Sequence, residues 1–287
     1  MVKEIGYAKI NLGLKVLGKR PDGYHAVDMI MQSISFADVL EITAAPSFTL
    51  TMDDPDLPTD HRNLAFKAAT LMSEATGRPL TVQLHITKNI FKAAGLAGGS
   101  TDAAAVLRGL NKFWNSGLTA IELEKLGEQI GSDVPFCVRG GTVRATGRGE
   151  VLEDLPALPT LWLVLVKPLH IDVSTAWAYQ NFTKATCHKP VSIEALVTAI
   201  KNGCVQDVLM NLGNDLETVT LLEYPLLTEI KNALQRQGAQ AVLMSGSGPT
   251  VFGIVSSEQE AQKIAQFMQA TYEVAAVAAS TGWRDEK

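Results

Sequence analysis

The sequence has little positive charge and no long apolar run. Its 25 Lys and Arg residues are outnumbered by 30 Asp and Glu, which gives a formal net charge of −5 over 287 residues. Nucleic acids and anionic membranes bind concentrated positive charge, so this balance argues against both as partners. Apolar runs such as Leu161–Val166 are too short to cross a bilayer, and the first residues contain no apolar signal-peptide core. We therefore expect a cytoplasmic protein.

Cysteine is scarce as well. Cys137, Cys187 and Cys204 are odd in number, widely spaced and free of any C-x-x-C pair. We expect them to be reduced and structural rather than metal ligands or catalytic thiols.

Internal repeats and low-complexity segments are also lacking. The 46% of hydrophobic and 19% of charged residues predict a globular protein, and the length is sufficient for two domains.

A glycine-rich stretch, residues 92–102, separates an expected strand from an expected helix. Alternating apolar residues at 80–86 predict a half-buried strand, and apolar residues at helical spacing over 106–114 predict a helix with one buried face. A helix start has unpaired N–H groups that stabilise an anion, and glycine lets a phosphate approach closely. The stretch thus predicts a polyphosphate site, although such loops also serve as plain turns. It is neither a Walker A loop nor the dinucleotide pattern G-x-G-x-x-G.

Three other places carry polar or aromatic residues that are open to two interpretations. Lys9 and Asn11 share one side of an expected strand over 7–18, which is typical either of a solvated face or of a site. Tyr24 and His25 follow a Pro-Asp-Gly turn, where they can pack together or bind a base. Asp133 stands at a loop or a new helix start, either as an N-cap or as a carboxylate available for chemistry.

The remaining chain predicts two halves joined by a linker. Residues 156–159 contain two prolines and mark the expected boundary. In the second half, strands and helices are expected in the order strand, helix, strand, strand, helix, strand, which predicts a ferredoxin-like unit. A second glycine-serine turn at 245–250 joins two of these strands. Residues 46–58, rich in Asp, Pro and Thr, are expected to form an excursion or β-ribbon.

Four motifs in this order resemble those of the GHMP kinases, named after galactokinase, homoserine kinase, mevalonate kinase and phosphomevalonate kinase. The inserted glycine in the loop is similar to that of the diphosphocytidyl-methylerythritol kinase branch. The motifs are Ala8–Leu12, Gly95–Thr101, Gly131–Phe136 and Ser245–Thr250, together with Arg20–His25. The resemblance implies an α+β, two-domain fold. Its N-terminal domain, residues 1–157, resembles ribosomal protein S5 domain 2, and its C-terminal domain, residues 158–287, is ferredoxin-like, with the active site in the cleft between them.

The resemblance also implies an ATP-dependent kinase of the non-mevalonate isoprenoid route, which phosphorylates the 2-hydroxyl of the methylerythritol moiety of a small-molecule substrate. A monomer or weak homodimer is expected. Mg²⁺ is implied by ATP, but no carboxylate cluster in the sequence identifies its ligands. Catalysis is assigned to Lys9 and Asp133, and substrate binding to Asn11, Tyr24, His25, Thr175 and Tyr179. ATP binding is assigned to Lys92, Ala93, Ala94, Gly95, Leu96, Ala97, Gly98, Gly99, Ser100, Thr101 and Asp102, and to Ser245, Gly246, Ser247 and Gly248.

The sequence departs from the family pattern at two positions, and two alternatives stay open. Phe91 and Tyr7 stand where the family has proline, which loosens pre-set backbone without removing a chemical group. One alternative is another kinase of the superfamily, acting on mevalonate, homoserine or a sugar, which would not need aromatic residues to hold a base. The other is a nucleotide-binding regulator without catalysis, which would not need Lys9 and Asp133.

Overall fold

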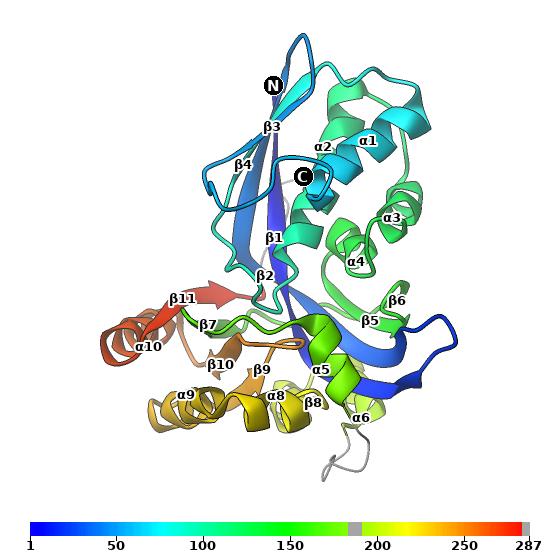
Figure 1. Ribbon diagram of the computed structural model, residues 1–287. Coiled ribbons are helices and arrows are strands. Elements are labelled where there is room, and N and C mark those ends of the chain that lie inside the picture. Colours follow the sequence, from blue (N-terminus) through cyan, green and yellow to red (C-terminus); the bar gives the residue numbers. More distant parts are fainter. Residues whose placement is uncertain (183–190, 283–287) are drawn as a thin grey trace. The chain divides into compact units, whose positions relative to one another are not determined.

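The structure, a computed structural model, describes residues 1–182 and 191–282, which form two compact units (Figure 1). The first unit comprises residues 1–8, 36–90 and 97–140; the second comprises residues 9–35, 91–96 and the described residues from 141 onward. Strands β1 (Val2–Lys19) and β2 (His25–Ala44) contribute residues to both. The boundary expected at 157/158 stays a prediction. In the part of the chain that the structure describes, no helix has the length and apolarity needed to cross a membrane.

The first unit packs helices on part of a sheet. Strand β3 (Thr49–Met52) pairs in parallel with β4 (Val82–Thr87), and β4 pairs antiparallel with residues 39–44 of β2. The segment expected as an excursion or ribbon therefore contributes a sheet strand. The helices are α1 (Leu64–Thr76), α2 (Gly98–Trp114), α3 (Ala120–Glu128) and α4 (Val134–Arg139). The strand expected over 80–86 and the helix expected over 106–114 are both confirmed, as β4 and within α2.

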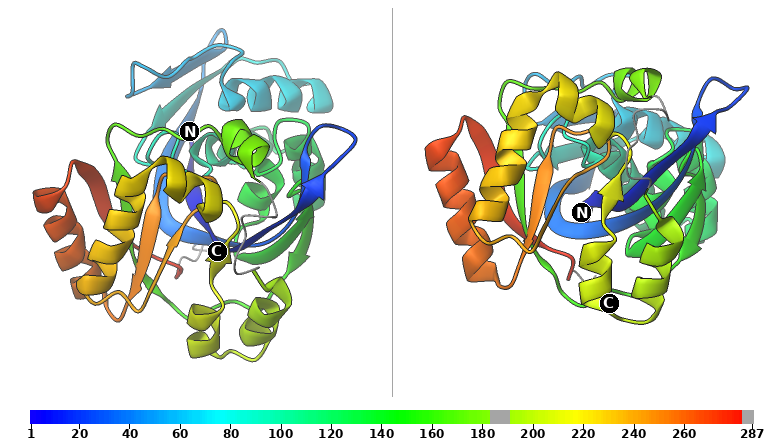
Figure 2. Two further views of the ribbon diagram at one scale, coloured as in Figure 1. Left: turned by 60° about the horizontal axis from the view of Figure 1, so that its bottom comes forward. Right: turned by 90° about the horizontal axis from the view of Figure 1, so that it is seen from below.

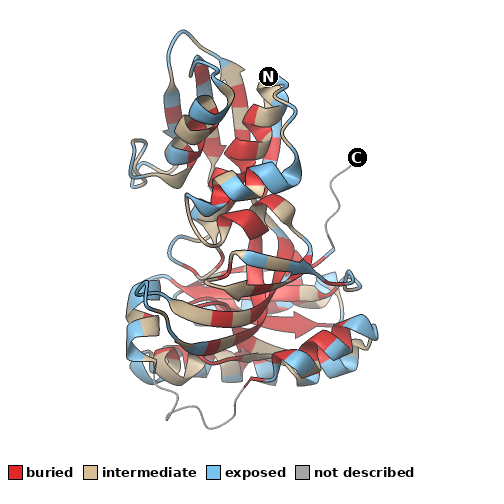
Figure 3. Cartoon of the chain, turned by 90° about the vertical axis from the view of Figure 1, so that its right-hand side faces the viewer, coloured by how far each residue is buried: buried red, intermediate tan, exposed pale blue. Residues whose placement is uncertain are grey.

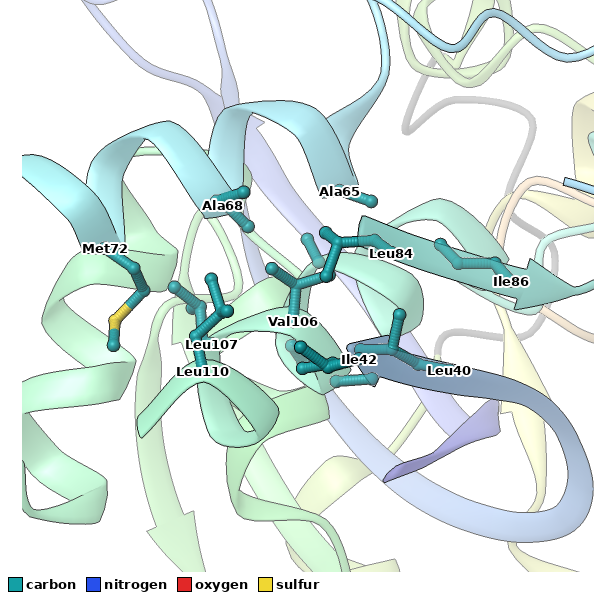
Figure 4. Close-up of a cluster of buried hydrophobic side chains, with 14 of the residues drawn as sticks. Leu40, Ile42, Ala65, Ala68, Met72, Leu84, Ile86, Val106, Leu107 and Leu110 are labelled. Atoms are coloured by element: carbon teal, nitrogen blue, oxygen red, sulfur yellow. The ribbon is translucent and has the colours of Figure 1, made fainter. Parts of the chain in front are cut away.

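Apolar side chains from both helices and strands form the core of the first unit. Figure 4 shows α1, α2, β4 and β2 each contributing side chains to one cluster. Small residues on α1 and α2 let the two helices approach each other and the sheet closely. The labelled members are Leu40, Ile42, Ala65, Ala68, Met72, Leu84, Ile86, Val106, Leu107 and Leu110. This packing fixes α2, and with it the helix start that follows the glycine-rich loop.

The second unit contains two groups of strands. Residues 27–32 of β2 pair antiparallel with β5 (Thr142–Gly147), which pairs with β6 (Val151–Asp154). Strand β8 (Gly213–Asn214) pairs in parallel with β1. The other group is a four-stranded sheet of β7 (Trp162–Pro168), β9 (Ala241–Met244), β10 (Val251–Val255) and β11 (Val274–Ser280).

The four-stranded sheet has the ferredoxin-like order β11-β7-β10-β9 with antiparallel neighbours throughout, which confirms the expected topology. Helices α9 (Pro225–Arg236) and α10 (Glu258–Thr271) cover one of its faces (Figure 2). Between β7 and α9 lie α5 (Thr175–Asn181), α6 (Ile193–Lys201), α7 (Val205–Met210) and α8 (Glu217–Glu223). Figure 3 shows the strands largely buried and the helices alternating between buried and exposed faces, as amphipathic helices do.

Candidate functional site

The side chains of Lys9 and Asn11 are buried in the second unit. They are only 4% and 1% exposed, so the interpretation of this strand side as a solvated face is wrong. Lys9 Nζ donates hydrogen bonds to Asn11 Oδ1 at 2.7 Å and to the carbonyl oxygen of Gly95 at 2.9 Å. Asn11 Nδ2 in turn lies 3.3 Å from the sulfur of Met29. The strand thus presents a fixed, buried amine beside the glycine-rich loop.

The loop Ser245–Gly248 also contacts Gly95. Ser245 Oγ donates to the Gly95 carbonyl oxygen at 3.0 Å, and Ser247 Oγ lies 3.1 Å from the hydroxyl of Thr175. Gly95 has a φ of 73°, and a Cβ there would collide with the carbonyl oxygen of Ser245. Only glycine fits this position. The structure therefore brings together Lys9 and Asn11 with Gly95, the Ser245–Gly248 loop and Thr175.

Helix α2 begins without a side-chain cap. Its N-cap residue, Ala97, lies in the left-handed region at φ 60° and forms no capping hydrogen bond. The backbone N–H of Thr101 bonds to the Ala97 carbonyl at 2.9 Å, so the N–H groups of Gly98, Gly99 and Ser100 precede the first intrahelical bond. Those three donors and the positive end of the helix dipole suit an anion.

The other predicted ATP-binding residues have diverse surroundings. Lys92 and Ala93 are exposed, whereas Ala94 and Leu96 are buried. Thr101 is 1% exposed, and its hydroxyl donates to the carbonyl of Tyr7 at 3.1 Å rather than facing solvent. Asp102 is also buried and pairs with Lys88.

Lys88, Asp38 and Asp102 form a buried charge cluster in the first unit that the sequence analysis missed. The ammonium of Lys88 pairs with Asp38 and lies 2.6 Å from Asp102 Oδ2. Asp38 Oδ1 also accepts the N–H groups of Asn89 at 2.6 Å and Ile90 at 2.8 Å. Burial is the main cause that raises the pKa of Asp102 to about 8; Lys88 opposes the shift and Asp38 adds to it. The cluster ties β2 and the end of β4 to the first turns of α2.

Asp133 occupies the N-cap position of α4 but does not cap it. Its side chain forms no hydrogen bond to the first turn of the helix, and its backbone is in the right-handed helical region. The interpretation of this carboxylate as an N-cap bond is therefore wrong, although its place at a helix start is confirmed. Asp133 belongs to the first unit and Lys9 to the second, so their assignment as a catalytic pair stays a prediction.

The predicted base-binding residues lie in the second unit as two ring contacts. The rings of His25 and Tyr179 stack with centroids 5.3 Å apart, so a base would enter between them only if they separated. Tyr24 is 56% exposed, and the guanidinium of Arg148 lies 5.2 Å from the centre of its ring. Burial, and secondarily Lys19, lowers the pKa of His25, which keeps the imidazole neutral at pH 7. Arg148 was missed because nothing in its local sequence pointed to Tyr24.

Among residues 1–182 and 191–282, no group of three His, Cys, Asp or Glu side chains is arranged to hold a metal ion. Cys137 and Cys204 are reduced thiols, as expected, and Cys187 lies outside the described residues.

Comparisons with known proteins agree with these features. A model of the GHMP kinases N terminal domain matches residues 63–141, and a model of the GHMP kinases C terminal domain matches residues 195–274. The 4-diphosphocytidyl-2-C-methyl-D-erythritol kinase of Geobacillus sp. (strain WCH70) is 50% identical over 259 residues, which cover 90% of this chain and 89% of the relative. The same-named kinase of Synechococcus sp. (strain JA-2-3B'a(2-13)) is 50% identical over 263 residues, which cover 88% and 85%.

Solved structures give the same result. A crystal structure of 4-(cytidine 5'-diphospho)-2C-methyl-D-erythritol kinase matches with a TM-score of 0.82 and 32% identity, covering 97% of this chain and 98% of that one. Homoserine kinase from Cytophaga hutchinsonii matches with a TM-score of 0.75 but 18% identity, covering 97% and 94%, and so shares the fold alone. The resemblance seen in the sequence motifs is thereby confirmed. The chain belongs to the 4-diphosphocytidyl-2-C-methyl-D-erythritol kinase family of the GHMP kinases, which are small-molecule kinases that use ATP.

Proposed function

We propose that the protein transfers the γ-phosphoryl group of ATP to the 2-hydroxyl of 4-diphosphocytidyl-2-C-methyl-D-erythritol. The products are the 2-phosphate and ADP, and the reaction belongs to the methylerythritol phosphate route to isopentenyl diphosphate. Relatives that carry the name of this kinase are 50% identical to the chain over nearly its whole length, which supports the assignment.

The observation that carries the proposal is the state of the Lys9 amine. It is buried, and its two hydrogen-bond partners, Asn11 Oδ1 and the Gly95 carbonyl, are neutral oxygens. Among the described residues, none of the ion pairs involves Lys9. Burying an ammonium without a carboxylate partner costs free energy, because neutral oxygens compensate only part of the lost hydration. A phosphate or the charge that develops during phosphoryl transfer would supply the missing anion.

The proposed reaction needs one proton acceptor and one anion cradle. The acceptor oxygen attacks the γ-phosphorus, the bond to the bridging oxygen of ADP breaks, and the hydroxyl proton passes to the carboxylate of Asp133. Asp133 suits this role because its side chain is not engaged in capping α4. Binding of the triphosphate is assigned to the N–H groups at the start of α2 and to the residues around Gly95 and Ser245–Gly248. The side chains of Thr101 and Asp102 are buried and bonded to Tyr7 and Lys88, and the N–H of Thr101 bonds within the helix, so the phosphate contacts are assigned to the N–H groups before Thr101.

The cytosine base is proposed to bind at the Tyr24, His25 and Tyr179 rings. A neutral imidazole can donate from one ring nitrogen and accept at the other, which matches the mixed donors and acceptors of a cytosine edge. The lowered pKa of His25 supports this neutral form. Thr175 lies on the same helix as Tyr179, and its hydroxyl is within hydrogen-bond distance of Ser247. In this proposal it contacts the remainder of the substrate.

Magnesium is expected to accompany the nucleotide. Because the described residues provide no three-ligand cluster, the ion would be held mainly by phosphate oxygens and water, as is common for Mg²⁺–ATP. When bound, it would neutralise charge on the phosphates.

The test is an ADP-release assay with the purified protein, ATP and the cytidyl substrate, with mevalonate and homoserine as competing acceptors. We expect ADP release with the cytidyl substrate but not with mevalonate or homoserine. ³¹P NMR should show a phosphate monoester at the 2-position of the product. Lys9→Met should lower kcat by at least about 100-fold. Lys167→Met is the matched control, because Lys167 is a buried lysine of the same unit that pairs with Asp172 instead. Turnover of mevalonate in place of the cytidyl substrate would contradict the proposal.

A further inference from the structure

Residues 213–217 connect strand β1 to the Ser245–Gly248 loop. Strand β8 pairs in parallel with β1, with Asn214 opposite Leu14, and is labelled in Figure 1. The next residue, Asp215, donates its backbone N–H to the Leu14 carbonyl and accepts the N–H of Val16 at its carboxylate, both at 2.9 Å. The segment is thus fixed to the strand that carries Lys9.

The side chain of Asn214 holds the loop on both sides of Ser245. It is 5% exposed, and its Nδ2 donates to the carbonyl oxygens of Met244 at 2.8 Å and Gly246 at 2.7 Å. Its Oδ1 accepts the N–H of Leu216 at 3.0 Å. Two donated bonds and one accepted bond fix the amide in one orientation.

Glu217 adds a second contact at the same place. Its carboxylate accepts the N–H of Met244 at 2.9 Å and pairs with Lys231 at 2.5 Å. Met244 is therefore held at its N–H by Glu217 and at its carbonyl by Asn214. The backbone entering the loop has little freedom to shift.

The loop held in this way contacts the Lys9 amine. Ser245 Oγ and Lys9 Nζ donate to the same acceptor, the Gly95 carbonyl oxygen. A Cβ built on Gly246 would lie 3.3 Å from Lys9 Nζ and 3.5 Å from Asn11 Oδ1, so the loop backbone packs directly against the amine. A displacement of the loop would therefore enlarge the space around Lys9 and disturb its acceptor.

We propose that Asn214 is a positioning residue for Lys9, which acts by fixing the Ser245–Gly248 loop as one wall of the space around the amine. The link between Asn214 and Lys9 is independent of the reaction. Its consequence for turnover rests on the proposed function, in which Lys9 stabilises the transferring phosphate. Asn214 itself touches neither reactant in this proposal.

The test measures the reactivity of Lys9 without catalysis. The folded protein is acetylated at trace level with an N-hydroxysuccinimide ester, and mass spectrometry gives the rate at each lysine. In Asn214→Asp, a carboxylate of similar size cannot donate to the two carbonyls, so Lys9 should react about tenfold faster relative to Lys167. Lys167 is the internal reference because it is also buried. Asn211→Asp is the control, since the side-chain amide of Asn211 donates to Asp207 of its own helix.

Two further variants make the test decisive. Ser245→Ala removes one donor from the Gly95 carbonyl and should also raise the acetylation rate of Lys9. In the double variant, with both Asn214→Asp and Ser245→Ala, the Lys9 rate should be only slightly above that of either single variant. If Asn214→Asp does not fold, Asn214→Ser, which retains one donor, should give an intermediate rate. An unchanged Lys9 rate in the folded variants, or an equal rise at Lys9 and Lys167, would overturn the inference.

Turnover supplies the second readout. Asn214→Asp should lower kcat about tenfold while KM for the cytidyl substrate stays within about twofold, because the ring contacts of the proposed base site are untouched. In a Lys9→Met background the same substitution should have no further effect on kcat. If the wild type fails to phosphorylate the cytidyl substrate, the proposed function fails, whereas the labelling result still decides the role of Asn214.

Discussion

Asp102 and Lys88 lie 2.6 Å apart with both side chains buried, and Lys88 is shared with a second carboxylate, Asp38. One cation thus serves two buried carboxyl groups at the first turns of α2. The arrangement explains why burial raises the pKa of Asp102 to about 8 despite its proximity to an ammonium. It also has a consequence for the pH dependence of stability.

We expect the free energy of unfolding to fall more steeply with pH in the wild type than in Asp102→Asn between about pH 4 and pH 8. A carboxyl whose pKa is higher in the folded than in the unfolded state binds a proton on folding. Its stabilising contribution is therefore complete below its unfolded value of 3.8 and is lost as the pH rises through about 8. Urea unfolding at each pH measures the two slopes. Asp60→Asn, at an exposed site, should keep the wild-type slope, and parallel slopes for Asp102→Asn would refute the prediction.

Gly95→Ala should abolish most activity, whereas Gly117→Ala should not. Both glycines have nearly the same left-handed backbone, with φ of 73° and 72°, so both variants pay about 1 kcal/mol of backbone strain. Only at Gly95 does the new Cβ strike the carbonyl of Ser245, while Gly117 has nothing within 4 Å. We expect more than a tenfold loss of kcat and a further loss of stability for Gly95→Ala alone, measured by turnover and thermal unfolding. Equal behaviour of the two variants would mean that the Gly95–Ser245 contact is unimportant.

His25 should make the KM for the cytidyl substrate depend on pH. Burial and Lys19 lower its pKa, so the imidazole is neutral at pH 7 and becomes charged only in acid. Protonation removes its acceptor nitrogen, so KM should rise as the pH falls into the acid range, with little change in kcat. His25→Asn, which keeps a donor and an acceptor without titrating, should flatten the profile. His170→Asn serves as the control because His170 is exposed, and it should retain the wild-type profile.

Asp133→Asn should separate catalysis from stability. Since the side chain of Asp133 makes no capping bond, its replacement should leave the melting temperature nearly unchanged while kcat falls by about 10²–10⁴-fold. Ser192→Ala provides the opposite case, because Ser192 accepts the N–H of Ala195 at the start of α6. That variant should lose about 1 kcal/mol of stability and keep its turnover. A large stability loss in Asp133→Asn would show that the carboxylate is structural.

The sequence predicted those elements whose signals are local. At α1, Asn63 and Gly77 are such local signals, because a cap side chain and a left-handed glycine act within one turn. The ferredoxin-like order followed from strands and helices with clear periodicity. Strand β8 was missed because it has two residues and depends on pairing with β1, far away in the chain.

The site was predictable where motifs are contiguous and not where contacts span the chain. The cluster around Gly95 joins Lys9 to Ser245, which are separated by more than two hundred positions, and neither stretch alone reveals the shared carbonyl acceptor. Lys88 looked like an ordinary lysine at a strand end, because its partners Asp38 and Asp102 lie 50 and 14 positions away. Burial also turned the hydroxyl of Thr101 inward, which no local pattern indicates.

The left-handed backbone of Ala97 determines how the first turn of α2 is completed. A capping side chain reaches the helix N–H groups from an extended backbone, and a φ of 60° lies outside that region. Exchanging Ala97 for Ser or Asp would therefore not supply the absent acceptor without refolding the loop. A bound anion would supply that acceptor, so we expect nucleotide to raise the melting temperature of the protein.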